Sequence, residues 1–218
     1  MATPVRTLAL AGTALSLALA PAAATAQRSD AEGDFLPTYT GPRNGDLDVR
    51  SVRFTFDNRS TFHFVSTSFG AIGTTPGAPF VWGINRGQGA AGFPTLAPGV
   101  LFDAVVVVNP FGASFVRDIP GALTTPLPVG AVRVSGADLF VDLAAALLPS
   151  RGFAFGDYTA NLWPRVGVGS NDQISDFAPD NRNIAVSTIP EPGTAALVLP
   201  ALGLVVAAAA SARRRRSA

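Results

Sequence analysis

Residues 52–65 read Val-Arg-Phe-Thr-Phe-Asp-Asn-Arg-Ser-Thr-Phe-His-Phe-Val, and this stretch decides the fold. Apolar and polar side chains alternate on both sides of a polar break at residues 57–60. Successive side chains of a β-strand point to opposite faces, so this alternation is typical of half-buried strands. The stretch therefore predicts a β-hairpin, with one strand over 52–56, a turn at 57–60 and a return strand over 61–68.

More strands are expected on the C-terminal side of this hairpin, separated by short Gly/Pro-rich turns. Residues 144–148 suit only one helical turn, because Pro149 limits a helix. The expected strands cover residues 79–85 with Phe80, Trp82 and Ile84 on one face, 101–108 buried on both faces, 131–143 as a hairpin around Ser135-Gly136-Ala137, 153–164, and 184–188. This pattern predicts an all-β fold, a single jelly-roll-like β-sandwich over residues 46–188. Residues 27–45 are polar and turn-rich, and we expect them to form a lead-in segment with one short strand near Phe35.

Residues 1–26 contain, in order, the charged start, the apolar run and the cleavage site that are typical of a secretory signal peptide. Arg6 supplies a positive charge, residues 8–20 are apolar or small, and Ala24-Thr25-Ala26 forms a small-x-small cleavage site. No twin-arginine pair precedes the apolar run, which favours the Sec translocon, with signal peptidase cutting after Ala26. The alternative is a buried N-terminal helix.

The C-terminal residues 189–216 contain three parts in a fixed order. Pro190-Glu191-Pro192 is followed by the uncharged segment 194–212 and then by Arg213-Arg214-Arg215-Arg216. As a helix, residues 194–212 would extend about 28 Å, close to the thickness of a bilayer core. The arginines should stay in the cytoplasm, so the preceding domain would lie outside. The sequence predicts a single transmembrane helix, and a simple tail anchor is the alternative to a sorting signal.

This tail resembles the PEP-CTERM sorting signal of Gram-negative bacteria, also called the ice-binding protein C-terminal domain. The resemblance implies that an inner-membrane exosortase recognises the tail and sends the protein to the cell surface or the medium. It also implies an association with exopolysaccharide and biofilm. The tail is an address shared by unrelated exported domains, so it indicates localisation and not activity. Whether the tail is removed or kept as an anchor stays open.

The composition excludes several kinds of site. The chain has no cysteine, no lysine and one histidine, His63, which excludes thiol nucleophiles, Cys-ligated metals and multi-histidine metal sites. Arg6, the four terminal arginines and Glu191 lie outside residues 27–189, which leaves 11 arginines and 14 acidic residues there, net −3. A basic patch for nucleic acid is therefore not expected.

Catalytic patterns are sparse in the remaining sequence. Glycines 87, 89 and 92 match G-x-G-x-x-G, but Pro94 and Pro98 oppose the helix that this dinucleotide motif must open. The sequence contains no G-x-S-x-G motif that could provide a nucleophilic serine for His63 to activate. We therefore expect no enzyme, and a hydrolase that uses aspartates is the weakest alternative.

Two loops carry oxygen side chains at spacings that suit calcium. The first is Asn44-Gly45-Asp46-Leu47-Asp48, but Thr55 stands where an EF-hand needs an acidic residue. The second, preferred as a calcium site, contains Asn171, Asp172, Asp176 and Asp180, followed by Asn181. Ordinary Asx-turn hydrogen bonding is the alternative for both loops.

Aromatic side chains could form a stacking surface for a sugar. Trp163 is the first candidate because it lies near the second acidic loop, and Trp82, Tyr158 and Tyr39 are the others. Core packing is the alternative. The sequence predicts an exported, non-catalytic structural or adhesive protein, and a carbohydrate-binding module, with or without calcium, is the alternative function.

Overall fold

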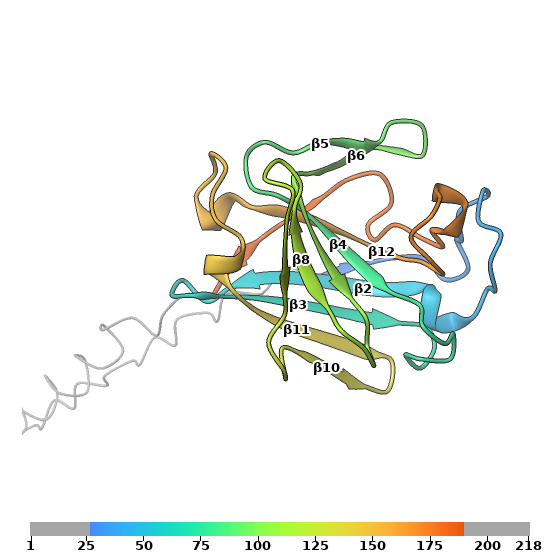
Figure 1. The fold of residues 1–218 in the computed structure, drawn as a ribbon. Helices are drawn as coiled ribbons and strands as arrows, with labels where there is room; N and C mark the ends of the chain where they lie inside the picture. The colour runs from blue at the N-terminus through green and yellow to red at the C-terminus, as the bar shows by residue number, and fades with distance from the viewer. Residues whose placement is uncertain (1–26, 190–218) are drawn as a thin grey trace, which may run out of the picture.

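The chain forms an all-β body in which two large sheets lie face to face (Figure 1). The structure is a computed structural model, and it describes residues 27–189. The predicted signal peptide at 1–26, Pro190-Glu191-Pro192, the segment 194–212 and the terminal arginines lie outside the described residues. Among residues 27–189, no helix has the length and apolar character needed to cross a membrane.

The first sheet, sheet A, contains the N-terminal hairpin and both ends of the body. Neighbouring strands of this sheet are antiparallel, except that β14 (Ser187–Thr188) runs parallel to β2 (Val49–Phe56). Its other strands, in spatial order, are β1 (Gln27–Ser29), β2 (Val49–Phe56), β3 (Thr61–Ser68), β11 (Asp138–Ala144) and β10 (Val132–Ser135).

The second sheet, sheet B, is antiparallel throughout. Its strands, in spatial order, are β13 (Ile184–Ala185), β12 (Thr159–Pro164), β4 (Phe80–Asn85), β7 (Ala104–Val108), β8 (Phe115–Asp118) and β9 (Leu123–Pro126). A separate hairpin pairs β5 (Ala90–Phe93) with β6 (Ala97–Phe102). The helical elements of the described residues are the 3-10 turns η1 (Gly45–Leu47), η2 (Ala145–Leu147), η3 (Phe155–Asp157) and η4 (Asn171–Gln173).

Aromatic rings fill the space between sheets A and B. Phe64 of β3 packs on Trp82 of β4, with ring centroids 5.2 Å apart. Phe62 stacks on Tyr158 at 5.3 Å, and Phe54 stacks on Phe64 at 4.6 Å. Burial of one such side chain contributes about 1.5–3 kcal/mol. The alternating pattern of the hairpin thus supplies the face that joins the two sheets.

A third layer covers the outer face of sheet B. Trp163 on that face contacts Phe93 and Phe102 of the β5–β6 hairpin, with centroids 5.0 and 5.1 Å away. Phe177 lies 6.1 Å from the same ring. Figure 1 shows the β5–β6 hairpin over β4 and β12. The part of sheet B formed by β12 and β4 is therefore covered on both faces, which explains why every residue of β4 is buried.

The structure confirms the all-β class, the hairpin at 52–68 and the hairpin around Gly136. It divides the expected strand 153–164 into η3 and β12, and the expected strand 184–188 into β13 and β14, which belong to different sheets. The expected helical turn at 144–148 is the 3-10 turn η2. The jelly-roll-like description of the strand connections stays a prediction.

The lead-in is built into the body. β1 pairs with β2, and Tyr39 packs with Leu47 and Ala78 in a small apolar cluster. The strand expected near Phe35 does not form, and the strand lies at Gln27–Ser29 instead. A three-residue edge strand is too short to show a periodicity, so the sequence pattern missed it.

The apolar run 101–108 is divided at Asp103. Arg86 is fully buried, and its Nε donates to Asp103 Oδ1 at 2.7 Å. The Arg86 guanidinium also binds Asp118, which in turn accepts from Arg151 at 2.5 Å. This buried ion pair ends β6 at Phe102 and begins β7 at Ala104, so only Ala104–Val108 forms the predicted central strand.

Replacing Arg86 by methionine should strongly destabilise the fold. Arg86→Met leaves the carboxylate of Asp103 buried without its cation, and we expect the free energy of unfolding to fall by about 3–5 kcal/mol. Urea unfolding measures the change, with Arg117→Met as the control, because Arg117 is exposed and bonds only to Thr124. A loss below about 1 kcal/mol for Arg86→Met would contradict this role.

Asp57, in the turn between β2 and β3, should make the stability of the fold depend on pH. Asp57 Oδ1 accepts from the backbone N–H groups of Thr61, Arg59 and Ser60 at 2.8–2.9 Å. These bonds, with that from Thr61 first, lower the pKa of Asp57 to about 2. A lowered pKa stabilises the fold above the unfolded value near 3.8, and the gain disappears as pH falls through 2. Wild type should exceed Asp57→Asn in stability at pH 5 and match it near pH 2, and a constant difference would contradict the cause.

Candidate functional site

Five aspartates from three distant segments meet beside the start of β2. Asp30 and Asp34 come from the lead-in, Asp48 precedes β2, and Asp176 and Asp180 lie between η4 and β13. Carboxylate oxygens of Asp34, Asp48 and Asp176 all lie within 4.8 Å of one another, and so do those of Asp30, Asp34 and Asp180. Asp34 belongs to both groups and joins them into one cluster, called the aspartate cluster below.

Backbone hydrogen bonds bring the three segments together. Leu36 N donates to Ser175 O at 2.8 Å, and Asp30 N donates to Arg50 O at 2.9 Å. The hydroxyl of Ser175 donates to Leu47 O at 2.8 Å. These bonds hold the chain segments that carry the aspartate cluster next to one another.

Two members of the cluster are almost fully buried. Asp48 is 4% exposed and Asp176 is 1% exposed. Asp48 Oδ2 accepts from Gly33 N at 2.8 Å, and Asp176 Oδ2 accepts from Val49 N at 3.0 Å. Asp48 Oδ1 is buried with no hydrogen-bond donor, as are Asp34 Oδ1 and Asp30 Oδ2. A buried polar atom without a partner is costly, so such atoms point to a missing ligand.

Burial and mutual repulsion raise the pKa of these carboxyl groups. Burial and then the charge of Asp34 raise the pKa of Asp30 to about 7. Burial and then the charges of Asp30 and Asp34 raise the pKa of Asp176 to about 8. The pKa values of Asp34 and Asp48 are raised as well, by burial first. Within the described residues, no arginine is among the causes of these four shifts.

The calcium loop predicted at residues 171–180 is divided in the structure. Asp176 and Asp180 join the aspartate cluster, whereas Asn171 and Asp172 lie in η4. The side chain of Asp172 binds the hydroxyl of Ser170, and its carbonyl accepts from Thr40 N at 3.0 Å. Neither Asn171 nor Asp172 belongs to the aspartate cluster.

The other predicted loop contributes only one residue. Asp48 joins the cluster, but Asp46 turns away and accepts from Thr75 N at 2.7 Å and from its hydroxyl at 2.8 Å. Asp30 and Asp34 were missed by sequence reasoning. Their four-residue spacing lies in a segment expected to be outside the domain, so nothing in the local pattern placed them beside Asp48.

The rings proposed for sugar stacking lie in the core. Trp163 is 2% exposed, Trp82 is 1% exposed, and Tyr158 is fully buried with its hydroxyl donating to Leu148 O at 3.0 Å. Tyr39 is also buried. This burial corrects the expectation of an open stacking surface on these rings, because the β5–β6 hairpin and sheet A cover the two faces of sheet B.

His63 forms a hydrogen bond with Asp142 on the outer face of sheet A. Its Nδ1 lies 2.7 Å from Asp142 Oδ1, while Arg133 donates to Asp142 Oδ2 at 2.9 Å. The glycine motif at 87–92 opens the β5 strand and not a helix, and the N–H groups of Gly87 and Gly89 bind Asn85 Oδ1. Neither feature forms a site with the aspartate cluster.

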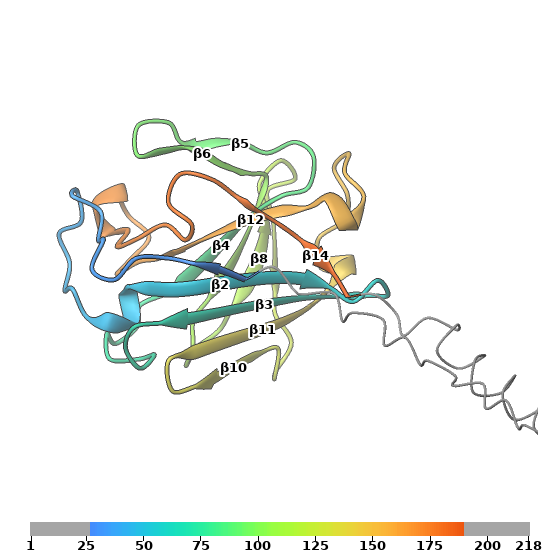
Figure 2. The ribbon, with the colours of Figure 1, turned by 180° about the vertical axis from the view of Figure 1, so that it is seen from behind.

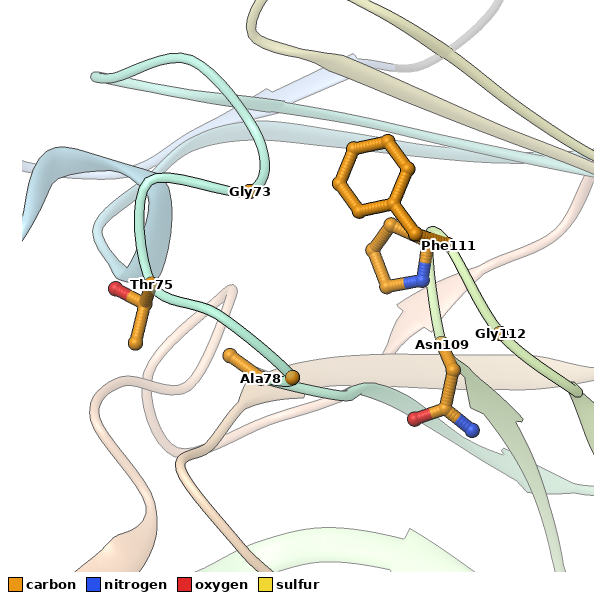
Figure 3. A pocket seen from close by; sticks show the side chains of 8 residues that line it. Gly73, Thr75, Ala78, Asn109, Phe111 and Gly112 are labelled. Atoms are coloured by element: carbon orange, nitrogen blue, oxygen red, sulfur yellow. The ribbon is translucent and has the colours of Figure 1, made fainter.

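One exposed aromatic residue lines a cavity that sequence reasoning did not single out. Phe111 is 76% exposed and borders a cavity of about 340 Å³ between the loops 73–78 and 109–112. Figure 3 shows Phe111 and Asn109 on one side of the cavity, with Gly73, Thr75 and Ala78 on the other. A Cβ added at Gly73 would lie 2.4 Å from Phe111 Cε2, so the ring rests on a glycine.

No family model, no curated protein and no solved structure matches this chain.

Proposed function

We propose that this chain is an exported, non-catalytic structural or adhesive protein of the Gram-negative cell surface, linked to exopolysaccharide. The proposal takes the predicted signal peptide at 1–26 and the tail at 189–216 as addresses used during export. The partners would be the Sec translocon, signal peptidase and an exosortase, with transient anchoring in the inner membrane.

The position of the two ends of the body carries this proposal. β1 and β14 both pair with β2, β1 along residues 51–53 and β14 along residues 55–56 (Figure 2). Ile189 N then donates to Phe56 O at 3.0 Å. Hydrogen bonds thus close the body just inside both predicted processing points. Cleavage after Ala26 would leave β1 and its pairing with β2 intact, which supports removal of the signal peptide.

The environment of the acidic residues supports a non-catalytic role. Asp176 and Asp48 have raised pKa values, as catalytic acids often do, but each is more than nine-tenths buried. A general acid must lie within hydrogen-bond reach of its substrate. A hydrolase that uses Asp176 or Asp48 as its general acid is therefore not favoured.

Export should depend on the terminal arginines. In a Gram-negative host with an exosortase, we expect protein recovered outside the inner membrane to begin at Gln27 and to lack the tail. Replacing Arg213–Arg216 by alanine should leave the chain in the inner-membrane fraction, because the tail then lacks one of the three parts that an exosortase would recognise. Cell fractionation and intact-mass measurement check both results.

A host without an exosortase is the control, since the wild-type chain should be retained in its inner membrane. Equal release of wild type and the arginine variant would contradict sorting by this tail. Recovery of a chain that still begins at Met1 would contradict the signal peptide.

Carbohydrate binding is a second candidate function, and the exposed ring of Phe111 favours it. An aromatic face beside a polar amide is a common way to hold a sugar, and Asn109 lines the same cavity. The exposed ring thus replaces the buried Trp163 as the stacking residue.

Replacement of Phe111 tests this candidate. The full-length protein in mild detergent is applied to a glycan array, and any bound glycan is then titrated by calorimetry. Phe111→Ala should weaken binding at least about tenfold, or about 1.4 kcal/mol. Leu123→Ala, which removes another exposed apolar side chain on β9, should have no effect. No bound glycan, or equal affinity of Phe111→Ala and wild type, would rule out this site.

A further inference from the structure

We propose that the aspartate cluster binds a calcium ion between Asp34, Asp48 and Asp176, with Asp30 and Asp180 on its outer side. This set differs from the loop that the sequence indicated, because three of its five members come from the first 48 residues. The ion would join the lead-in, the start of β2 and the segment before β13. Binding by this cluster does not depend on whether the tail is processed.

The first support is the charge of the cluster. Three carboxyl groups within 4.8 Å of one another repel strongly when they are ionised, and two of them are almost fully buried. The ion pairs found in the described part of the chain use Asp103, Asp118 and Asp142, and none uses a member of the cluster. A bound cation supplies the missing positive charge.

The second, independent support is an oxygen atom without a donor. Asp48 is 96% buried, and its Oδ2 is used by Gly33, whereas its Oδ1 is buried and accepts no hydrogen bond. Asp34 Oδ1 is also buried without a hydrogen-bond donor, and carboxylate oxygens of Asp34, Asp48 and Asp176 lie within 4.8 Å of one another. Buried carboxylate oxygens that lack donors are the ligands that a hard cation uses.

The ligand chemistry favours calcium among the common cations. Calcium is bound by oxygen atoms about 2.4 Å away, so two oxygens on opposite sides of the ion are about 4.8 Å apart. The oxygens of Asp34, Asp48 and Asp176 lie within 4.8 Å of one another, so one ion could contact all three. Magnesium prefers about 2.1 Å and keeps several waters, so it suits a buried cage of carboxylates less well. Zinc prefers nitrogen and sulfur ligands, and His63 lies on β3, on the other side of β2 from β1.

The site lies at the opposite end of sheet A from the tail junction. Asp48 directly precedes β2, while Ile189 bonds to Phe56, the last residue of that strand. Figure 2 shows η1 at the start of β2 and β14 at its far end. A body held by its tail would thus present the calcium site away from the point of attachment.

Calcium binding should be measurable directly. The full-length protein in mild non-ionic detergent is freed of cations with a chelator, dialysed, and titrated with calcium chloride by calorimetry. We expect one strong site with a dissociation constant of about 10⁻⁵–10⁻³ M, the range of sensor and extracellular sites. At calcium about 100-fold above that constant, the melting temperature should rise by about 5–10 °C. Magnesium chloride at the same concentration should give a smaller rise.

Asp48→Asn separates metal binding from simple stability. The amide oxygen can still accept from Gly33, but one negative charge of the cage is gone. We expect this variant to melt higher than wild type in chelator, because repulsion is reduced, and to lose the rise with calcium. Asp34→Asn should show the same two changes, which keeps the test valid if Asp48→Asn does not fold.

Asp172→Asn is the matched control, since Asp172 is an exposed aspartate of the predicted loop that lies outside the cluster. It should keep the full response to calcium. The proposal is overturned if wild type shows no heat of binding and no rise in melting temperature at 10 mM calcium, on the order of ten times the weakest expected constant. It is also overturned if Asp34→Asn binds calcium as wild type does, or if magnesium gives an equal rise.

Discussion

Burial of one alternating row of aromatic side chains is the constraint on which this structure depends. The inward rings of β2 and β3 need a second apolar surface, and β4 and β12 of sheet B supply it. The contact of Phe64 with Trp82 joins the two sheets at their centre. Since the chain has no cysteine, this packing and the strand pairing must hold the sandwich together.

The aspartate cluster adds a requirement of a different kind at the edge of this core. The lead-in packs along β2 only if Asp30 and Asp34 come close to Asp48 and Asp176. The backbone bonds of Leu36 and Asp30 favour that approach, and the repulsion of the carboxylates opposes it. A calcium ion would replace the repulsion between these carboxylates by attraction to the ion, so that the same residues would hold the lead-in in place. This balance would connect the folded state to the calcium concentration outside the cell.

Alternating apolar residues and turn residues predicted the hairpins whose two strands are close together in the sequence. The hairpin at 52–68 was predicted correctly because its alternation and its turn lie within a few residues of one another. The same reasoning could not divide the apolar run at Asp103, because the partner Arg86 is buried by contacts remote in the sequence. It could not foresee that a hairpin covers Trp163, because alternation shows that one face is apolar and not what packs on the other. The aspartate cluster was not predicted for a related reason, since its residues come together only when β1 pairs with β2.

The most direct test of the central claim, that a cation joins Asp34, Asp48 and Asp176, is a structure of the exported protein from crystals grown in calcium chloride. The account predicts one calcium ion bound by an oxygen of each of these residues at about 2.3–2.6 Å, with the lead-in paired to β2. Carboxyl groups that share hydrogen bonds directly with one another, with no ion between them, would contradict it.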